Sequence, residues 1–463
     1  MTLCRRLSLF MVLLPGLVLA LASGMTVQQD AAPVDSPPNF VIILADDLGY
    51  GDLSCYGDYS RALTPHLDRM ASEGLRFTDF HSSGNVCSPT RAGLLTGRYQ
   101  QRAGIPGVIN ADPKVAEHFF GLGRNETTFA ECLKQAGYQT GVFGKWHLGY
   151  DVYFNPLEHG FDEFRGYVSG NIDYTSHYDR MEKFDWWKGR ALEDQRDPGP
   201  IGRVKNGYVT HLVTKNAIDF IERNKARPFC LYVAHQAVHS PWQGPLDAPI
   251  RGPNARKDLM ADKNDTVVFA KMLEALDEGV GEILATIETC GIADRTMVLF
   301  FSDNGPAAGS AGPLRGRKGS NYEGGHRVPA IAWWPSRIEP RQQTDAQAIS
   351  LDVMPTLLAI AGYDDQACLN LDGVDLSPVL FDRQSLGNRQ LFWNGRAMRD
   401  GKWKLVLGKS NQGEVQLFDL SQDLGEKANV ADQHPERARQ MQKALEHWII
   451  EVARGATAQP AQH

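Results

Sequence analysis

Short apolar runs alternate with amphipathic runs along the chain from about residue 39 to residue 361. The apolar runs predict buried strands at 40–44, 138–143, 229–234 and 296–301. The amphipathic runs predict helices at 64–74, 127–136, 207–224, 265–290 and 351–361. Strands and helices in alternation predict a large, mainly parallel sheet covered by helices, which is an α/β fold.

The pattern changes after about residue 375. Shorter strand-like runs at 391–393, 402–407 and 415–418 precede an amphipathic helix at 434–452. We therefore expect a main domain at 39–375, a smaller C-terminal α+β subdomain at 376–455 and a tail at 456–463.

The first residues have the pattern of a targeting segment. Arg5 and Arg6 precede an apolar run that ends in Ala20-Leu21-Ala22. This pattern predicts a secretory signal peptide at 1–22 and a flexible, Pro-rich leader at 23–38, with an uncleaved anchor as the alternative. We expect an exported protein: periplasmic or extracellular in a bacterium, and lysosomal or secreted in a eukaryote. No other stretch is long and apolar enough to predict a membrane span.

Composition narrows the class of protein. Of 463 residues, 42% are hydrophobic, which is enough for a large core and too much for a disordered chain. The net charge of −7 argues against a protein that binds nucleic acid by neutralising phosphates. An anionic substrate stays possible, because a basic pocket can lie on an acidic protein. The cysteines that follow the predicted signal peptide are scattered and form no CxxC pair, so their disulfide pairing is left open.

Polar residues follow each of the four predicted strands. In chain order they are Asp46-Asp47, then Lys145 and His147, then His235 and His239, and finally Asp303-Asn304. Ligands bind beyond the carboxyl ends of strands in open α/β sheets, so parallel neighbouring strands would gather these groups at one edge. Any single pair has an ordinary alternative, since Asp and Asn are common turn residues.

Four of these residues offer only oxygen ligands: Asp46, Asp47, Asp303 and Asn304. Carboxylate and amide oxygens suit hard cations such as Ca²⁺ or Mg²⁺, whereas a Zn²⁺ site would include His or Cys. The set therefore predicts a site for a hard cation, with helix-capping turns as the alternative.

The segment Cys87-Ser88-Pro89-Thr90-Arg91 predicts the start of a helix. Ser88 suits the N-cap and Pro89 the first helical turn, so the positive end of the helix would face Cys87 and an anion bound there. Arg91 adds a fixed cation one turn into the helix. The alternative is a buried structural cysteine before an ordinary helix.

Lys318 lies with Arg315 and Arg317 in a basic, Gly-rich loop. The loop is either part of an anion site or simply solvated. Its spacing does not match a phosphate-binding P-loop, and His235 with His239 does not match a zinc-protease helix, so both of those interpretations are rejected.

Taken together, these segments resemble the formylglycine-dependent (type I) sulfatases. Residues 87–91 match the C-x-P-x-R signature of that family, and residues 92–98 match its continuation. Residues 144–149 match the second signature, and 302–305 and 323–329 match further family segments in the same order. The likeness is greatest to arylsulfatases and N-acetylgalactosamine-6-sulfatases.

The resemblance implies an alkaline-phosphatase-like fold, with the sulfatase catalytic domain at 39–375. It implies that a formylglycine-generating enzyme oxidises Cys87 to formylglycine, whose hydrated aldehyde attacks sulfur. The implied ligands of a single Ca²⁺ are Asp46, Asp47, Asp303, Asn304 and the modified Cys87. In the remaining implied roles, Arg91 holds the diol, Lys145 and Lys318 neutralise sulfate oxygens, His147 acts as a base, His239 assists the leaving oxygen, and His235 supports the site.

The function implied is that of a secreted sulfatase acting on a sulfated sugar or an aryl sulfate. Two other functions stay open: a phosphodiesterase or phosphonate monoester hydrolase of the same superfamily, and a non-enzymatic binder of sulfated glycans. The loops at 99–125, 151–206 and 240–262 are expected to decide which sulfate is removed. The sequence leaves open the natural substrate, exo or endo action and the oligomeric state.

Overall fold

The computed structural model describes residues 37–57, 59–60, 62–193, 207–253, 255, 265–365, 369–408 and 414–459. All of these belong to one compact unit that begins at Pro37. The predicted signal peptide and most of the leader at 23–38 lie outside the described residues.

A ten-stranded sheet forms the centre of the fold, in the order β11-β2-β10-β9-β1-β8-β4-β5-β6-β7. Its strands are β1 (Asn39–Ala45), β2 (Leu75–Phe77), β4 (Gln139–Lys145), β5 (Glu163–Tyr167), β6 (Trp187–Lys188), β7 (Ala191–Leu192), β8 (Phe229–Ala234), β9 (Thr296–Ser302), β10 (Ala330–Trp333) and β11 (Gln342–Thr344). The four strands predicted from apolar runs are the adjacent, parallel strands β9, β1, β8 and β4. The predicted α/β fold is therefore confirmed.

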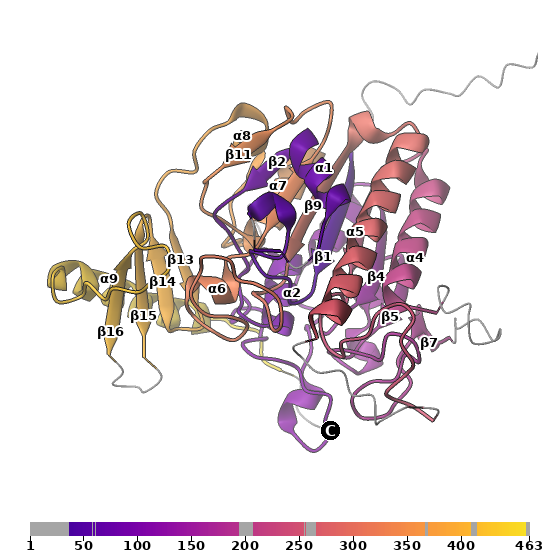
Figure 1. Ribbon diagram of the computed structural model, residues 1–463, viewed down its shortest axis with the longest axis horizontal. Helices are drawn as coiled ribbons and strands as arrows, with labels where there is room; N and C mark the ends of the chain where they lie inside the picture. The colour runs from indigo at the N-terminus through magenta and orange to yellow at the C-terminus, as the bar shows by residue number, and fades with distance from the viewer. Residues whose placement is uncertain are drawn as a thin grey trace, which may run out of the picture. The chain divides into compact units, whose positions relative to one another are not determined.

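Helices cover both faces of this sheet, which is why every residue of β1 is buried. Phe40, Ile42 and Leu44 face one hydrophobic core, and Val41 and Ile43 face another. The first core is closed by α2 (Cys87–Thr96), α3 (Phe129–Gln135), α7 (Val353–Ala361) and α8 (Ser377–Asp382). The second is closed by α1 (Pro65–Glu73), α4 (Val209–Asn224) and α5 (Thr266–Thr289), and Figure 1 shows α4 and α5 lying side by side.

A smaller antiparallel sheet follows near the C-terminus, with α9 (Pro435–Ala453) packed on it. Its strands are β13 (Gln390–Trp393), β14 (Ala397–Asp400), β15 (Trp403–Leu407) and β16 (Val415–Asp419), drawn in yellow in Figure 1. The indole Nε1 of Trp393 donates a hydrogen bond to the carbonyl oxygen of Ser82, 2.8 Å away, and so ties this sheet to the main domain. The described residues also form the short strand pair β3 (Phe80–His81) and β12 (Ala348–Ile349), the single turn α6 (Glu323–His326) and several 3-10 turns.

The start of α2 differs in detail from the prediction. The helix begins at Cys87 with Val86 as its N-cap, and no side chain caps it. Ser88 lies inside the first turn, where its Oγ accepts a hydrogen bond from the backbone N–H of Ile109 at 3.2 Å. The prediction that Ser88 is the N-cap is therefore wrong, because Ser88 fixes a neighbouring loop instead.

Within the described part of the chain, no helix combines the length and the apolar character that crossing a membrane requires.

Candidate active site

The polar residues that follow the four central strands lie together at one edge of the sheet. Ala45 pairs with Ser302 at the ends of β1 and β9, and Leu44 and Gly144 both pair with Ala234 of β8. The parallel register therefore brings segments that are far apart in the sequence to one place, as the sequence predicted.

The turn after β1 is fixed by hydrogen bonds to its neighbours. The backbone N–H of Asp46 donates to the carbonyl oxygen of Ala237 at 3.0 Å. Asp47 has a left-handed backbone, with φ of 61°, and its N–H donates to Oδ1 of Asp303 at 3.2 Å. Both carboxylates are buried, so their directions are set by the backbone and do not depend on solvent.

Two buried cations neutralise this group of acids. Lys145 Nζ lies 2.5 Å from Oδ2 of Asp46. The guanidinium of Arg91 donates from Nε and Nη2 to Oδ2 of Asp303, at 3.1 and 2.8 Å. Burial and the neighbouring Asp46 carboxylate raise the pKa of Asp303 to about 6, even though Arg91 acts in the opposite direction. The acids are thus crowded enough to favour additional positive charge between them.

Cys87 lies between the carboxylate of Asp46 and the ammonium group of Lys318. Only 3% of the residue is exposed, and its Sγ is 3.4 Å from Oδ1 of Asp46 and 3.4 Å from Nζ of Lys318. Burial raises the pKa of the thiol, but Lys145 and Lys318 outweigh burial and lower that pKa to about 6. The side chain at position 87 is therefore held in a positive electrostatic environment at the start of α2.

Lys318 is held in place, in contrast to the solvated-loop alternative. Its Nζ is 2.6 Å from Oδ1 of Asp47, and its backbone N–H donates to the carbonyl oxygen of Pro306 at 3.1 Å. The next residue, Gly319, donates from its N–H to the carbonyl oxygen of Asn85, directly before the Cys87 segment. The loop and the start of α2 are thereby fixed to each other.

Two histidines complete the centre, and their hydrogen bonds differ. Nε2 of His147 lies 3.0 Å from the carbonyl oxygen of Ile109, so Nε2 carries the proton and the buried Nδ1 keeps its lone pair. Burial, followed by the charge of Lys145, lowers the pKa of His147 well below its usual value.

Nδ1 of His239 lies 2.6 Å from the carbonyl oxygen of Ser240, and its Nε2 faces Asp47 at 3.6 Å. Burial and Lys318 lower the pKa of His239, but the carboxylates of Asp47 and Asp46 outweigh them and raise it.

His235 lies at the end of β8 but turns elsewhere. Its ring is fully buried, and within the described residues neither ring nitrogen has a hydrogen-bond partner. Burial lowers its pKa to about 3, and the one charged neighbour that contributes is His211 of α4. No described contact connects His235 with the Cys87 centre.

A pocket of about 230 Å³ opens above Cys87, His147, His239 and Lys318. Its lining also includes Asn110, Tyr150, Asn171 and Arg180, which no sequence motif singled out. Asn110 lies in loop 99–125 and Asn171 and Arg180 lie in loop 151–206, where specificity was expected but no motif marks individual positions. The pocket has the polar groups that an anionic ligand requires.

The carboxylate and amide oxygens at this edge of the sheet fit a hard cation. Asp46 and Asp47 each offer an oxygen that lies within 4.8 Å of ligand atoms of Cys87 and His239, whose thiol and imidazole are ligand types that Zn²⁺ also accepts. Asn304 donates from Nδ2 to Oδ1 of Asp47 at 2.7 Å, while its buried Oδ1 has no hydrogen-bond donor among the described residues. A cation among these oxygens would provide Asn304 Oδ1 with a partner and would relieve the crowding of the carboxylates.

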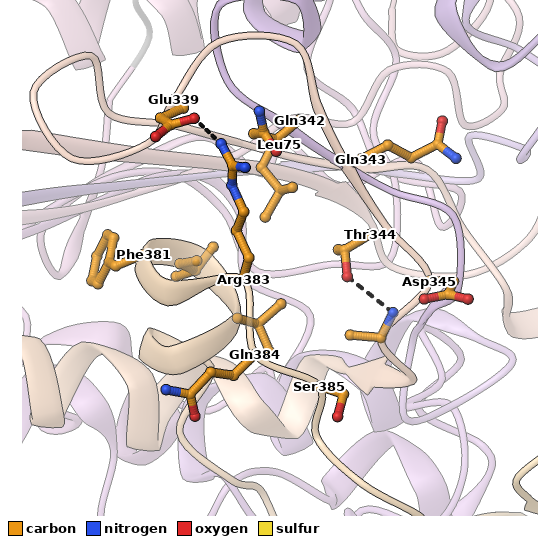
Figure 2. A pocket seen from close by; sticks show the side chains of 13 residues that line it. Leu75, Glu339, Gln342, Gln343, Thr344, Asp345, Phe381, Arg383, Gln384 and Ser385 are labelled. Carbon is orange, nitrogen blue, oxygen red and sulfur yellow. Dashed lines mark hydrogen bonds and ion pairs between the residues drawn. The ribbon is translucent and has the colours of Figure 1, made fainter.

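A separate hollow of about 240 Å³ lies next to β11 and α8 (Figure 2). Of its three charged side chains, Glu339 and Arg383 point toward each other and form an ion pair, and Asp345 is the third. Thr344 Oγ1 accepts a hydrogen bond from the backbone N–H of Ala346 at 3.1 Å.

Comparison with known proteins agrees with this geometry. Residues 38–363 match the family description "Sulfatase", and residues 317–454 match "N-sulphoglucosamine sulphohydrolase, C-terminal". The chain is 37% identical over 392 residues to N-acetylgalactosamine-6-sulfatase of Mus musculus, covering 80% of this chain and 71% of that protein. It is 34% identical over 467 residues to arylsulfatase A of Homo sapiens, covering 89% and 86% of the two chains.

Among solved structures, the chain is similar to Ps i-CgsB in complex with k-i-k-neocarrahexaose. The TM-score is 0.77 at 27% sequence identity, and the match covers 89% of this chain and 93% of that one.

Proposed function

Because this chain belongs to the sulfatase family and is a sulfuric ester hydrolase acting on sulfated sugars or aryl sulfates, we propose that its reaction takes place at Cys87. The observation that carries the proposal is that Cys87 lines the pocket together with Lys318 and both histidines. The Sγ of Cys87 lies 3.4 Å from Lys318 Nζ. A sulfate ester that enters this pocket meets the nucleophilic position and its cations together.

Cys87 is proposed to be oxidised to formylglycine, whose hydrated aldehyde provides a hydroxyl nucleophile toward sulfur and a second hydroxyl for release of the sulfate. Lys318 reaches the pocket and neutralises sulfate oxygens. Lys145, which forms an ion pair with Asp46, adds a second positive charge close to Cys87 for the same sulfate oxygens. Arg91 is held by Asp303 and fixes the position of the acids around the nucleophile.

The two histidines have complementary proposed roles. His147 keeps its Nδ1 lone pair free and so accepts a proton from the second hydroxyl of the hydrate. His239 directs Nε2 toward the acids beside the pocket and delivers a proton to the leaving oxygen. A positioned acid or base of this kind contributes about 10²–10⁴-fold to the rate.

Asp46, Asp47, Asp303, Asn304 and the modified Cys87 are proposed to hold one Ca²⁺. When bound, the ion supplies positive charge for sulfate oxygens and for the nucleophile. Asp303→Ala should lose bound metal and activity together, as measured by metal analysis and turnover. Asp419→Ala, at an exposed ion pair with Lys402, is the control and should change neither. Stoichiometric Zn²⁺ in the active enzyme would contradict the oxygen-ligand assignment.

A side-by-side assay with an aryl sulfate and an aryl phosphodiester tests the reaction. The sulfate should be the better substrate, and the mass of the peptide that contains Cys87 should match formylglycine. A preference for the phosphodiester would favour the phosphodiesterase or phosphonate hydrolase alternative. Turnover of the sulfate by a protein with an unmodified thiol at Cys87 would contradict the proposed nucleophile.

Export and maturation by a formylglycine-generating enzyme are parts of the proposal that rest on the sequence at 1–22 and 87–91. Sequencing the N-terminus of the protein from its native compartment tests export. A mature chain that begins after Ala22 would support it, and an intact N-terminus would contradict it.

A further inference from the structure

Part of the lining of the active-site pocket is rich in hydrogen-bond donors. Arg180, Asn110 and Asn171 line the same pocket as Cys87. None of them belongs to the proposed centre of Cys87, the lysines and the histidines. These three residues therefore have a function other than binding the sulfate that is cleaved.

Arg180 is an arginine of the pocket lining that keeps free donors. It is exposed, and its Nη2 donates to Oδ1 of Asn110 at 2.5 Å. Among the described residues no carboxylate forms an ion pair with Arg180. The nearby acid Asp179 accepts hydrogen bonds at Oδ1 from the backbone N–H groups of Met181 and Lys183, both at 2.8 Å. An arginine has five N–H donors, so most of those on Arg180 remain available to a ligand.

The two asparagines are oriented so that they also offer donors. Oδ1 of Asn110 accepts from Arg180 and from the backbone N–H of Asp112 at 3.0 Å. Oδ1 of Asn171 accepts from Nη1 of Arg251 at 2.6 Å. The Oδ1 acceptors of both asparagines are therefore occupied. Neither Nδ2 group donates a hydrogen bond within the described residues, so both can donate to a ligand. Burial lowers the pKa of Arg251, with a smaller contribution from Arg180, although the carboxylates of Asp173, Asp179 and Glu182 act in the opposite direction.

We propose that Arg180, Asn110 and Asn171 form a second anion subsite, so that the natural substrate carries another anionic group beside the sulfate that is removed. The inference rests on the proposed function, because it assumes that the scissile sulfate lies at Cys87. Two sources share the required chemistry: a second sulfate on the saccharide and a uronate carboxylate. Arginine binds both through paired N–H groups.

Three substrates and the Arg180→Gln variant test the subsite. The substrates are a neutral monosulfated sugar, the same sugar with a second sulfate, and a monosulfated disaccharide that contains a uronate. Arg180→Gln should raise KM about 5–30-fold for one or both dianionic substrates, the size expected for a solvent-accessible hydrogen bond to a charged group. KM for the neutral monosulfated sugar should stay within about twofold. The dianionic substrate whose KM rises shows whether the subsite binds a sulfate or a carboxylate.

Arg190→Gln is the matched control, since Arg190 is also exposed and forms an ion pair with Glu158 away from the pocket. It should leave all three KM values unchanged. Equal changes in KM for neutral and dianionic substrates on Arg180→Gln, or no change for any, would overturn the subsite.

An aryl sulfate assay separates this result from failure of the proposed function. Arg180→Gln should turn over an aryl sulfate with the wild-type kcat. Wild-type enzyme without aryl or sugar sulfate turnover would contradict the reaction at Cys87. Normal turnover without discrimination by Arg180 would contradict the subsite alone.

Discussion

At the scale of single residues, the surroundings of Cys87 determine what each substitution there should do. The Lys318 ammonium group and the Asp46 carboxylate flank the side chain at equal distances of 3.4 Å. A hydroxyl at this position would keep the flanking groups and the pocket. It would lack the second hydroxyl of a hydrated aldehyde, through which the sulfate is proposed to leave.

Cys87→Ser should therefore give at most one slow turnover and a stable adduct about 80 Da heavier, the mass of SO₃ on a covalent intermediate. Intact-protein mass spectrometry after incubation with an aryl sulfate measures this adduct. Cys87→Ala should be inactive and form no adduct. Cys290→Ser, at a half-buried cysteine in another part of the chain, is the control and should keep full turnover. Multiple turnover by Cys87→Ala near the wild-type rate would rule out the mechanism.

The position of His239 beside Asp47 leads to a prediction about leaving groups. If His239 protonates the leaving oxygen, His239→Ala should slow alkyl and sugar sulfates by about 10²–10⁴-fold. A phenol with electron-withdrawing groups leaves without a proton, so its sulfate should lose little. Plotting log kcat/KM against the pKa of the leaving alcohol measures the difference. Equal losses across the series would assign His239 to binding instead.

At the scale of elements, the turn α6 connects the small sheet with the Lys318 loop. Glu323 accepts hydrogen bonds from Lys404 of β15 at 2.8 Å and from Arg399 of β14 at 2.9 Å. The carbonyl oxygen of Gly325 accepts a hydrogen bond from the N–H of Gly305. A Cβ on Gly305 would lie only 1.9 Å from the carbonyl oxygen of Gly324, so only glycine fits at position 305. The small sheet therefore supports the loops around the active site through α6.

Lys404→Met should destabilise the fold by about 3–5 kcal/mol, because it leaves part of the buried charge of Glu323 uncompensated. Activity should fall as well, since α6 supports the Lys318 loop. Lys402→Met is the matched control: Lys402 pairs with Asp419 at the surface, where such pairs contribute about 0–1 kcal/mol. Urea unfolding of the three proteins measures the difference. Equal stability of Lys404→Met and Lys402→Met would contradict the supporting role of α6.

The elements that could be predicted from the sequence are the buried strands that consist of an uninterrupted apolar run. β1 and β9 are buried along their whole length and were predicted within two residues. β14 reads Ala-Met-Arg-Asp, and its Arg399 is buried only because Asp79 and Glu323 meet it from the main domain. Such a strand has no local apolar pattern, so it could not be predicted. Arg180 was missed for a similar reason, since only the folded pocket distinguishes it from other exposed arginines.

At the scale of the whole molecule, the buried charges between the small sheet and the main domain make stability depend on pH. Oε2 of Glu426 accepts a hydrogen bond from the N–H of Glu323 at 2.8 Å, and its buried Oε1 has no partner among the described residues. Burial raises the pKa of Glu426 to about 8, although Lys404 acts in the opposite direction. The folded protein thus holds a proton that the unfolded chain releases near its ordinary pKa of about 4.3.

Because the folded pKa is raised, Glu426 contributes a loss of stability as pH rises from about 4.3 to about 8, by up to about 1.4 kcal/mol per pH unit. Glu426→Gln keeps the acceptor for Glu323 and does not titrate. The variant should match the wild type near pH 5 and become increasingly more stable toward pH 8. Thermal unfolding across this pH range measures the difference. Parallel curves for the two proteins would contradict the raised pKa.

The central position of β1 means that the sheet around it can be completed only late in synthesis of the chain. The first residue of β1, Asn39, pairs with Thr296 of β9, a separation of 257 residues along the chain. At about 5–20 residues per second, a ribosome needs on the order of 10–50 s to add that length. The segment at 87–91 is synthesised early in this interval, so for most of it the segment exists without the strand that completes its surroundings. The modifying enzyme proposed for Cys87 would therefore have seconds of access to a cysteine that is 3% exposed in the finished fold. Thiol alkylation of nascent chains arrested before and after residue 302 would measure when that access ends.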